Sequence, residues 1–152
     1  MILALLIGRK GSVGFPGKNL YPVLGKPLAF YPMKAALNAK GVDKVYISTD
    51  DEELMELAEK NRVEVIARPP ELCTKKALGE DAFVHGYFEI KKRNPGKAIE
   101  LVVLLFCNSA TVTPNLIEEG IRVLIENPEI DSAVSVSMYN MWSPLRARKI
   151  GE

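Results

Sequence analysis

The first twenty residues, MILALLIGRKGSVGFPGKNL (residues 1–20), decide the fold. The apolar run over residues 2–7 is too short to cross a bilayer and ends at once in glycine and charge, which predicts a buried strand. Glycine and proline then recur too densely for regular structure, at Gly8, Gly11, Gly14, Pro16 and Gly17. The chain is therefore expected to begin with a buried strand that leads into a glycine-rich loop.

This loop has the composition of an anion-binding site. Glycines that follow a buried strand allow several backbone N–H groups to approach one anion. Arg9, Lys10 and Lys18 add positive charge, and Ser12 adds a hydroxyl donor. Phosphate is the expected ligand. The simpler alternative is a flexible surface connection that carries ordinary solvated basic residues.

The loop matches neither of two common phosphate-binding motifs. A Walker loop reads G-x-x-x-x-G-K-[ST], whereas Gly17 and Lys18 are followed here by Asn19. The dinucleotide fingerprint G-x-G-x-x-G is also absent, because the glycines recur at every third position. The loop therefore predicts a phosphate ligand without assigning the chain to either of these classes.

Length and composition predict one globular domain over residues 1–152. The chain is 47% hydrophobic and 26% charged, as folded domains are. Its net charge of +1 gives no reason to expect a nucleic-acid partner. With no stretch long enough to span a membrane and no basic secretory leader, we expect a cytoplasmic protein without a membrane partner.

The two cysteines, Cys73 and Cys107, predict neither a disulfide framework nor a metal site. Neither has a second cysteine or a histidine at metal-ligand spacing. We expect both to be reduced, packed thiols.

The rest of the chain alternates between helical and strand patterns. Helices are predicted over residues 28–39, from the capping residues 49–51 to about residue 61, and over residues 79–92 and 114–126. Strands are predicted over residues 42–48, 63–67, 99–106 and 131–137, and the very apolar 99–106 run looks like a central strand covered on both faces. Asp50 is expected to cap a helix rather than to bind metal or ribose. This alternation predicts an α/β fold with a mostly parallel sheet.

Ligands of parallel α/β sheets bind beyond the carboxyl ends of the strands. The segments expected there are residues 8–19, 48–51, 68–77 and 107–113. Together they supply glycine, basic and hydroxyl groups. This set indicates a nucleotide or sugar-phosphate pocket more readily than a hydrolytic site.

Five segments carry a family resemblance in their order and approximate spacing. They are RKGSVGFPGKN (residues 9–19), GKPL (25–28), STD (48–50), RPPEL (68–72) and DSAVSVS (131–137). They resemble the cytidylyltransferases that activate sialic acid and related acidic nine-carbon sugars, whose opening motif is close to R-x-G-S-K-G-x-P-x-K-N. The resemblance covers nearly the whole chain. It implies a Rossmann-like, three-layer α/β nucleotidyltransferase fold.

The resemblance also implies an activity and its partners. Such an enzyme joins CTP to an acidic sugar and releases pyrophosphate, acts as a homodimer and uses Mg²⁺. As catalytic residues, Arg9 and Lys18 would hold the triphosphate and neutralise charge as pyrophosphate leaves. The remaining site residues implied by the motifs are Gly8, Gly11, Ser12 and Asn19 for the nucleotide, Arg68 and Ala77 for the cytosine base, and Asn108 and Ser109 for the sugar.

The chain also departs from the family pattern. Val13 stands where the family has a lysine, with Lys10 nearby as a substitute, and Lys75 stands where an aspartate is common. The family's Q-P-T-S-P after the central strand becomes FCNSA (residues 106–110), without the glutamine that makes a polar contact. Family members continue beyond the length of this chain into a part that carries the paired aspartates for Mg²⁺. We therefore expect no metal ligands here.

Three interpretations stay open from the sequence. The chain is a sialic-acid-type cytidylyltransferase, a catalytically silent nucleotide-binding domain, or another sugar nucleotidyltransferase such as one that makes CMP-linked Kdo. The aromatic and basic segment over residues 138–150 either approaches the active site and the partner subunit or is a disordered tail.

Overall fold

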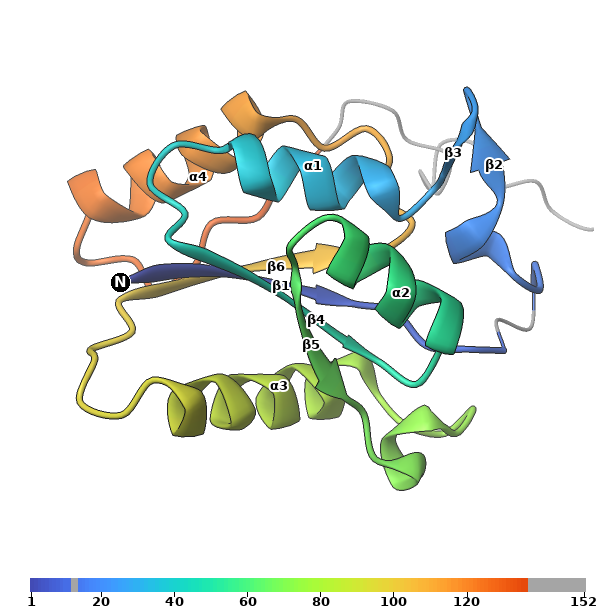
Figure 1. Cartoon of the computed structure of the whole chain (residues 1–152). Coiled ribbons are helices and arrows are strands. Elements are labelled where there is room, and N and C mark those ends of the chain that lie inside the picture. The colour runs from blue at the N-terminus through green and yellow to red at the C-terminus, as the bar shows by residue number, and fades with distance from the viewer. Residues whose placement is uncertain (12–13, 137–152) are drawn as a thin grey trace, which may run out of the picture.

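A four-stranded parallel sheet forms the centre of the molecule, in the order β5-β4-β1-β6 (Figure 1). The computed structural model describes residues 1–11 and 14–136. The strands are β1 (Ile2–Ile7), β4 (Lys44–Thr49), β5 (Glu64–Ala67) and β6 (Leu101–Phe106). The predicted α/β fold with a parallel sheet is confirmed.

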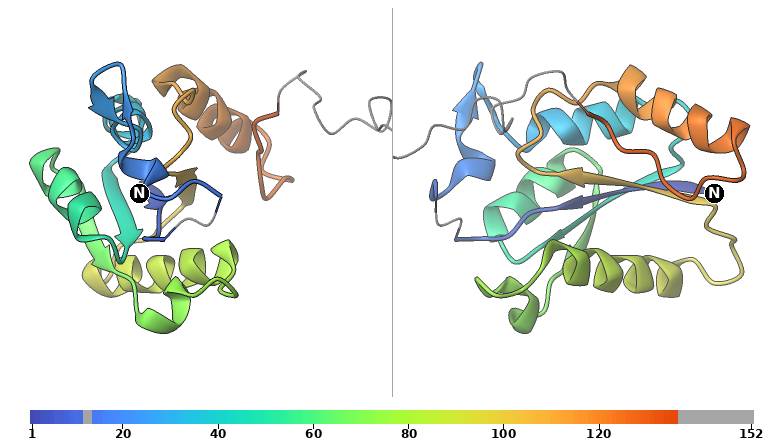
Figure 2. Two further views of the ribbon diagram at one scale, coloured as in Figure 1. Left: turned by 90° about the vertical axis from the view of Figure 1, so that its right-hand side faces the viewer. Right: turned by 180° about the vertical axis from the view of Figure 1, so that it is seen from behind.

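Helices cover both faces of this sheet. One face carries α1 (Phe30–Asn38), α2 (Glu52–Lys60) and α4 (Pro114–Glu126), and the other carries α3 (Gly79–Arg93), as Figures 1 and 2 show. Alternate residues of β1 face opposite layers: Ala4 and Leu6 pack with the three-helix layer, and Leu3 and Leu5 pack with the α3 layer. The six residues of β1 are all buried, which explains the unbroken apolar run at the start of the sequence.

The strand register brings the four loops of the predicted site to one edge. Ile7 at the end of β1 pairs with Ser48 of β4 on one side and with Phe106 of β6 on the other. Thr49 pairs with Ala67, so β5 ends at the same level. The segments that follow these strands therefore leave the sheet side by side, as the sequence predicts for a ligand site.

Short elements link the main ones. Between β1 and α1 the chain forms a 3₁₀ turn, η1 (Lys18–Leu20), and the antiparallel pair β2 (Pro22–Val23) and β3 (Lys26–Pro27). A second 3₁₀ turn, η2 (Pro70–Cys73), precedes α3. Local chemistry fixes the helix starts: Pro32 lies in the first turn of α1, and the Thr113 hydroxyl accepts the Leu116 N–H at 3.2 Å in α4.

The cap of α2 corrects one expectation. Asp51, not Asp50, is the N-cap, and its carboxylate accepts the Glu53 N–H at 3.1 Å. The Asp50 carboxylate instead accepts the backbone N–H of Lys10 at 2.7 Å. Asp50 is therefore tied to the glycine-rich loop rather than to the helix that follows it.

The predicted strand over residues 131–137 is wrong for residues 131–136, and residue 137 lies outside the described residues. Residues 131–136 form no strand, and the side chains of Val134 and Val136 are 81% and 91% exposed. A β-prone run becomes a strand only where another strand pairs with it, and no described strand lies beside this one.

The apolar strand β6 is not central in the described part of the sheet but forms its edge. Leu104 and Phe106 are 40% and 49% exposed, because α3 packs over β1 and β4 rather than over β6.

Two predicted features fall outside the described residues. They are Ser12 in the glycine-rich loop and the aromatic and basic segment over residues 138–150. Among the described residues, no helix is both long and apolar enough to cross a membrane.

Candidate functional site

A cavity of about 200 Å³ opens at the carboxyl edge of the sheet. It is bordered by the loop after β1, the turn after β5, the start of α3 and the end of β6. Seven of the ten predicted site residues line it: Gly8, Arg9, Lys18, Asn19, Arg68, Ala77 and Asn108. Gly11 and Ser109 do not line it, and Ser12 lies outside the described residues. Residues from five separate stretches of sequence thus meet in one place.

The apolar part of this cavity was not predicted from the sequence. Its other lining residues are Ile7, Leu72, Leu78, Gly79 and Phe106. The sequence could have indicated two of them. Ile7 is the last residue of β1 and Phe106 is the last residue of β6, and these two strands pair with each other. The others come from the segment between β5 and α3, whose course the proline-rich sequence does not predict.

Gly8 lies where the chain passes too close to its neighbours for a side chain. Its backbone N–H donates to the Ser48 carbonyl at 3.2 Å. A Cβ atom there would lie 2.5 Å from the Cys107 Sγ and 2.9 Å from the Cys107 Cβ. This glycine therefore allows the loop to leave β1 between β4 and the segment after β6.

Asn19 closes the other end of the loop. Its side chain is buried, with 7% exposed, and its Nδ2 lies 3.5 Å from the Arg9 carbonyl oxygen, at the limit of hydrogen bonding. Its backbone carbonyl accepts the Ala29 N–H at 2.8 Å, which ties the loop end to the start of α1. Asn19 therefore joins the two ends of the loop, in addition to lining the cavity.

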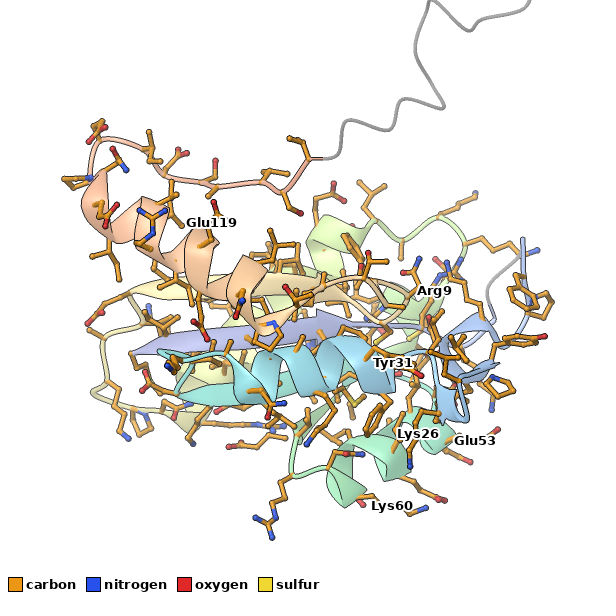
Figure 3. All side chains as sticks on the ribbon, turned by 90° about the horizontal axis from the view of Figure 1, so that it is seen from above. Arg9, Lys26, Tyr31, Glu53, Lys60 and Glu119 are labelled. Atoms are coloured by element: carbon orange, nitrogen blue, oxygen red, sulfur yellow. The ribbon has the colours of Figure 1, made fainter. Side chains whose placement is uncertain are left out.

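The α1 side of the loop is held by a second contact. The Tyr31 hydroxyl donates to the Val23 carbonyl, so α1 fixes the short β2-β3 hairpin that follows the loop. Figure 3 shows Arg9, Tyr31 and Lys26 at the same end of the molecule. Arg9 itself is half-buried, and its guanidinium lies 3.4 Å from the Gly11 carbonyl oxygen.

Arg68 supplies a buried positive charge to the cavity. Only 8% of the residue is exposed, and its guanidinium donates to the Ser48 carbonyl at 2.7 Å and approaches the Ser48 hydroxyl at 3.3 Å. No carboxylate forms an ion pair with it among the described residues. Burial lowers the pKa of Arg68, yet a guanidinium stays charged at neutral pH. A buried cation without a carboxylate partner is suited to an anionic ligand.

Ala77 and Asn108 offer different groups to the cavity. The Ala77 N–H is already used, because it donates to the backbone and side-chain oxygens of Thr74 at 3.3 and 3.2 Å. Asn108 is exposed, so its amide is free to meet a ligand. Ser109 donates its N–H to the Phe106 carbonyl at 3.0 Å and shapes the turn that carries Asn108.

The two cysteines are free thiols, and they are not activated nucleophiles. Burial raises the pKa of Cys107 to about 12 and, together with the nearby Asp50 carboxylate, raises that of Cys73. The Cys73 thiol donates to the Pro69 carbonyl at 3.2 Å. Both therefore remain protonated and packed at neutral pH.

The buried Cys107 thiol predicts a loss of stability in alkali. Its pKa is about 12 in the folded chain and about 8.5 when unfolded, so only the unfolded state ionises in between. The free energy of unfolding should fall from about pH 8.5 upward, by at most about 1.4 kcal/mol per pH unit. Urea titrations of wild type and Cys107→Ala from pH 7 to 10.5 measure this. Parallel curves for the two proteins would contradict it.

The described residues contain no cluster of three protein side chains that could hold a metal ion. Among residues 1–11 and 14–136, no three His, Cys, Asp or Glu side chains gather as metal ligands. The two acids that follow β4 are engaged, since Asp50 accepts the Lys10 N–H and Asp51 caps α2. No catalytic step can therefore be assigned to a metal held by these residues.

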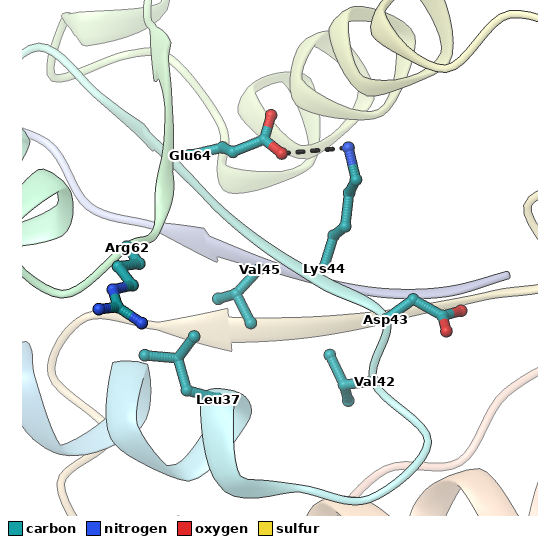
Figure 4. A pocket seen from close by; sticks show the side chains of 7 residues that line it. All are labelled: Leu37, Val42, Asp43, Lys44, Val45, Arg62 and Glu64. Atoms are coloured by element: carbon teal, nitrogen blue, oxygen red, sulfur yellow. Dashed lines mark ion pairs between the residues drawn. The ribbon is translucent and has the colours of Figure 1, made fainter.

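A second cavity of about 200 Å³ lies at the opposite, amino end of the strands (Figure 4). Its charged lining includes Lys44 and Glu64, which pair at 3.2 Å, and the hydrogen bond that Lys44 donates to the Glu64 carboxylate raises the pKa of Lys44. None of the predicted site residues lies there. The amino-end cavity is lined by two cations and two carboxylates, Lys44, Arg62, Asp43 and Glu64, whereas the carboxyl-edge cavity is lined by three cations and no carboxylate. The amino-end cavity is therefore less suited to an anion.

Solved structures of similar fold support the architecture. A CMP-2-keto-3-deoxy-manno-octonic acid synthetase, solved in complex with CTP, aligns with a TM-score of 0.67 and 22% identity over 84% of this chain and 48% of that one. A cytidylyltransferase from Leptospira borgpetersenii aligns with a TM-score of 0.65 and 19% identity over 83% and 49%. These likenesses confirm the predicted Rossmann-like, layered nucleotidyltransferase fold.

Relatives of known name match between about half and four fifths of this chain. An N-acylneuraminate cytidylyltransferase of Escherichia coli is 36% identical over 84 residues, which is 55% of this chain and 20% of that protein. A pseudaminic acid cytidylyltransferase of Campylobacter jejuni is 30% identical over 130 residues, 82% of this chain and 53% of the relative. The matched region thus spans between a fifth and about half of these relatives.

The family model described as cytidylyltransferase matches residues 3–148, almost the full length of the chain. That match includes the glycine-rich loop, the buried arginine and every residue that lines the carboxyl-edge cavity. The chain belongs to the cytidylyltransferase family.

Proposed function

We propose that this protein binds CTP and transfers CMP from it to an acidic sugar, with release of pyrophosphate. The observation that carries the proposal is the gathering of Arg9, Lys18 and buried Arg68 around one cavity beside the glycine-rich loop. Two of these cations at the carboxyl edge of a parallel sheet, Arg9 and Lys18, are suited to a triphosphate, and Arg68 would donate to the cytosine base. Membership of the cytidylyltransferase family supports cytidine as the nucleoside.

The proposed reaction forms one bond to phosphorus and breaks another. A sugar hydroxyl attacks the α-phosphorus of CTP and loses its proton to solvent. The bond from the α-phosphorus to the oxygen that bridges to the β-phosphorus breaks, so that pyrophosphate leaves. The protein's contribution is positioning and charge stabilisation. Arg9 and Lys18 would neutralise the departing pyrophosphate. The phosphate contacts that the family motif implies for Gly11 and Ser12 stay predictions, because Gly11 does not line the cavity and Ser12 lies outside the described residues.

Cytosine recognition is proposed for the part of the cavity that Arg68 and Ala77 line. Cytosine presents an amino group where uracil presents an acceptor, so selection for CTP needs an acceptor such as a backbone carbonyl. Because the Ala77 N–H already donates to Thr74, the carbonyl is the main-chain group that this residue has left. Arg68 would supply donors to the carbonyl oxygen of the base.

The cavity is smaller than a whole nucleotide site. Its volume of about 200 Å³ lies below the roughly 300–1,000 Å³ of typical small-molecule pockets. We therefore assign it to part of CTP, with the acceptor sugar placed over Asn108 and Ser109 at the exposed edge beside β6.

For the sugar that accepts CMP, we propose a chemical class and not one compound. The relatives are named for N-acylneuraminate, pseudaminic acid and, in Shewanella woodyi, 8-amino-3,8-dideoxy-manno-octulosonate. All three names describe acidic sugars. A sialic-acid-type and a Kdo-type acceptor fit this set equally well. The absence of a three-ligand metal cluster among the described residues favours, as the second candidate, a nucleotide-binding domain without turnover of its own.

Pyrophosphate release tests the function directly. The protein is incubated with CTP and Mg²⁺ and a panel of acidic sugars, with ATP, GTP and UTP as controls. We expect release with CTP and one acidic sugar, and none without the sugar. CTP binding without turnover would identify the silent domain, and absence of selective CTP binding would overturn both candidates.

Arg9→Ala and Lys18→Ala should each weaken CTP binding. Each removes one charge-assisted contact to phosphate, worth about 1.5–3 kcal/mol, so the Kd should rise roughly 10- to 100-fold. Calorimetric titration with CTP measures this. Lys60→Ala is a matched control, because Lys60 is an exposed lysine of α2 that pairs with Glu56. Unchanged affinity in both site variants would contradict the assignment.

Four further expectations remain predictions. They are homodimer formation, the use of Mg²⁺, a cytoplasmic location and a single domain over residues 1–152.

A further inference from the structure

We propose that Asp50 is a positioning residue that holds the glycine-rich loop in the form that binds phosphate. This inference rests on the proposed function, because it concerns the same loop. Its basis is the hydrogen bond from the Lys10 backbone N–H to the Asp50 Oδ1 at 2.7 Å, between residues 40 positions apart. The bond joins the loop after β1 to the end of β4.

The end of β4 anchors three parts of the site. The Ser48 carbonyl accepts the Gly8 N–H at 3.2 Å and the Arg68 guanidinium at 2.7 Å. Two residues on, Asp50 accepts the Lys10 N–H. The first residues of the loop are thus tied to β4 at two points, and the buried arginine is tied to the same segment. Loss of the hydrogen bond between Lys10 and Asp50 would free the loop from Arg9 onward, while the hydrogen bond of Gly8 to Ser48 would remain.

Asp50 does not cap the helix that follows it. The cap of α2 is made by Asp51, whose own N–H lies 3.1 Å from the Thr49 hydroxyl. No metal-ligand cluster among the described residues includes Asp50. The hydrogen bond to Lys10 is therefore its one specific contact to a backbone group.

The charge of Asp50 works against a phosphate ligand. Its carboxylate lies close enough to Arg68 and to the Cys73 thiol to influence both electrostatically. A negative charge beside an anion site repels a triphosphate. The same charge favours the cationic form of Arg68, but a guanidinium stays charged at neutral pH without that help. The property of Asp50 that the loop needs is therefore its acceptor oxygen, which asparagine also has.

Two substitutions of Asp50 should have different effects on CTP binding. Asp50→Ala removes the acceptor and should raise the Kd for CTP about tenfold, because the loop must then be ordered on binding. Asp50→Asn keeps an acceptor for Lys10 and removes the charge, so its Kd should stay within about twofold of wild type or fall. A metal-binding role predicts the opposite, with both variants equally impaired.

Asp43 provides a matched control within the same sheet. Its carboxylate accepts the Ile2 N–H at 2.7 Å, so it makes the same kind of bond at the opposite, amino end of β1 and β4. Asp43→Ala should leave the Kd for CTP unchanged, whatever it does to stability. An equal loss of affinity in Asp43→Ala and Asp50→Ala would reduce Asp50 to a general structural role and overturn the proposal.

The decisive experiment combines binding with hydrogen exchange at the Lys10 amide, followed by NMR in the ligand-free protein. Asp50→Ala should exchange at least about tenfold faster there than wild type, with Asp50→Asn close to wild type. Unchanged exchange in Asp50→Ala, or faster exchange without loss of affinity, would overturn the proposal, as would equal losses in Asp50→Asn and Asp50→Ala.

Pyrophosphate serves as a second ligand that needs no base recognition. If wild type binds pyrophosphate but not CTP, the proposed function fails. In that case the role of Asp50 is upheld if Asp50→Ala raises the Kd for pyrophosphate while Asp50→Asn and Asp43→Ala do not. If wild type binds neither, the loop is not a phosphate site, and both proposals fail.

Discussion

Replacing Gly8 by alanine is expected to lower the free energy of unfolding by about 1–3 kcal/mol, the usual cost of forcing an extra methyl group into a packed core. The added Cβ would lie 2.5 Å from the Cys107 Sγ, and Cys107 is itself buried with 1% exposed. The neighbouring strand end must therefore move. Because the glycine-rich loop starts at Gly8, the same shift should also weaken CTP binding. Urea denaturation and calorimetry measure the two effects.

Two further variants make this prediction specific. Gly14 belongs to the same loop but has no atom within 4 Å of the position of a Cβ, so Gly14→Ala should change stability by less than about 0.5 kcal/mol. Adding Cys107→Ala to Gly8→Ala removes the 2.5 Å contact and leaves the one at 2.9 Å, so stability should return in part. Equal stabilities of Gly8→Ala and Gly14→Ala would contradict the close approach.

Arg68→Met is expected to raise the Kd for CTP by roughly 10- to 100-fold. Methionine keeps the apolar stem but removes the guanidinium, which is the most buried positive charge of the cavity. A charge-assisted hydrogen bond lost from a buried site costs about 1.5–3 kcal/mol. The fold should persist, because the Ser48 carbonyl still accepts the Gly8 N–H. Circular dichroism and calorimetric titration check the two statements.

Arg93 offers the matched control for this variant. Its guanidinium also donates to a strand carbonyl, that of Val65 at 2.8 Å, but it stands at the end of α3 and does not line the carboxyl-edge cavity. Arg93→Met should therefore leave the CTP affinity unchanged. If both arginine variants bind CTP as wild type does, Arg68 has no part in nucleotide binding.

The fold class was predictable because its signals are local. The apolar run of β1, the Thr113-Pro114 start of α4 and the proline in the first turn of α1 each follow from short-range chemistry. Alternation of helix and strand then implies a parallel sheet, and with it the edge at which ligands bind. The seven predicted residues that share one cavity were brought together by this reasoning and by the family resemblance.

What escaped prediction depends on contacts between distant segments. Nothing in the local sequence distinguishes Asp50 from Asp51, since both precede α2, and only the register of β1 against β4 brings Asp50 to Lys10. Residues 131–136 have a strand-like pattern, but a strand also needs a partner, which the described sheet does not supply. The exposure of β6 has the same origin, because the helix on the α3 face packs over β1 and β4 instead.

The most direct test of the account is calorimetric titration of the wild-type chain with CTP, UTP, GTP and ATP in turn, repeated for Arg68→Met and Arg93→Met. We predict that CTP binds at least about tenfold more tightly than the other three, and that only Arg68→Met weakens it. Equal affinity for all four nucleotides, or CTP binding that Arg68→Met leaves intact, would contradict a selective cytidine nucleotide site at the carboxyl edge of the sheet.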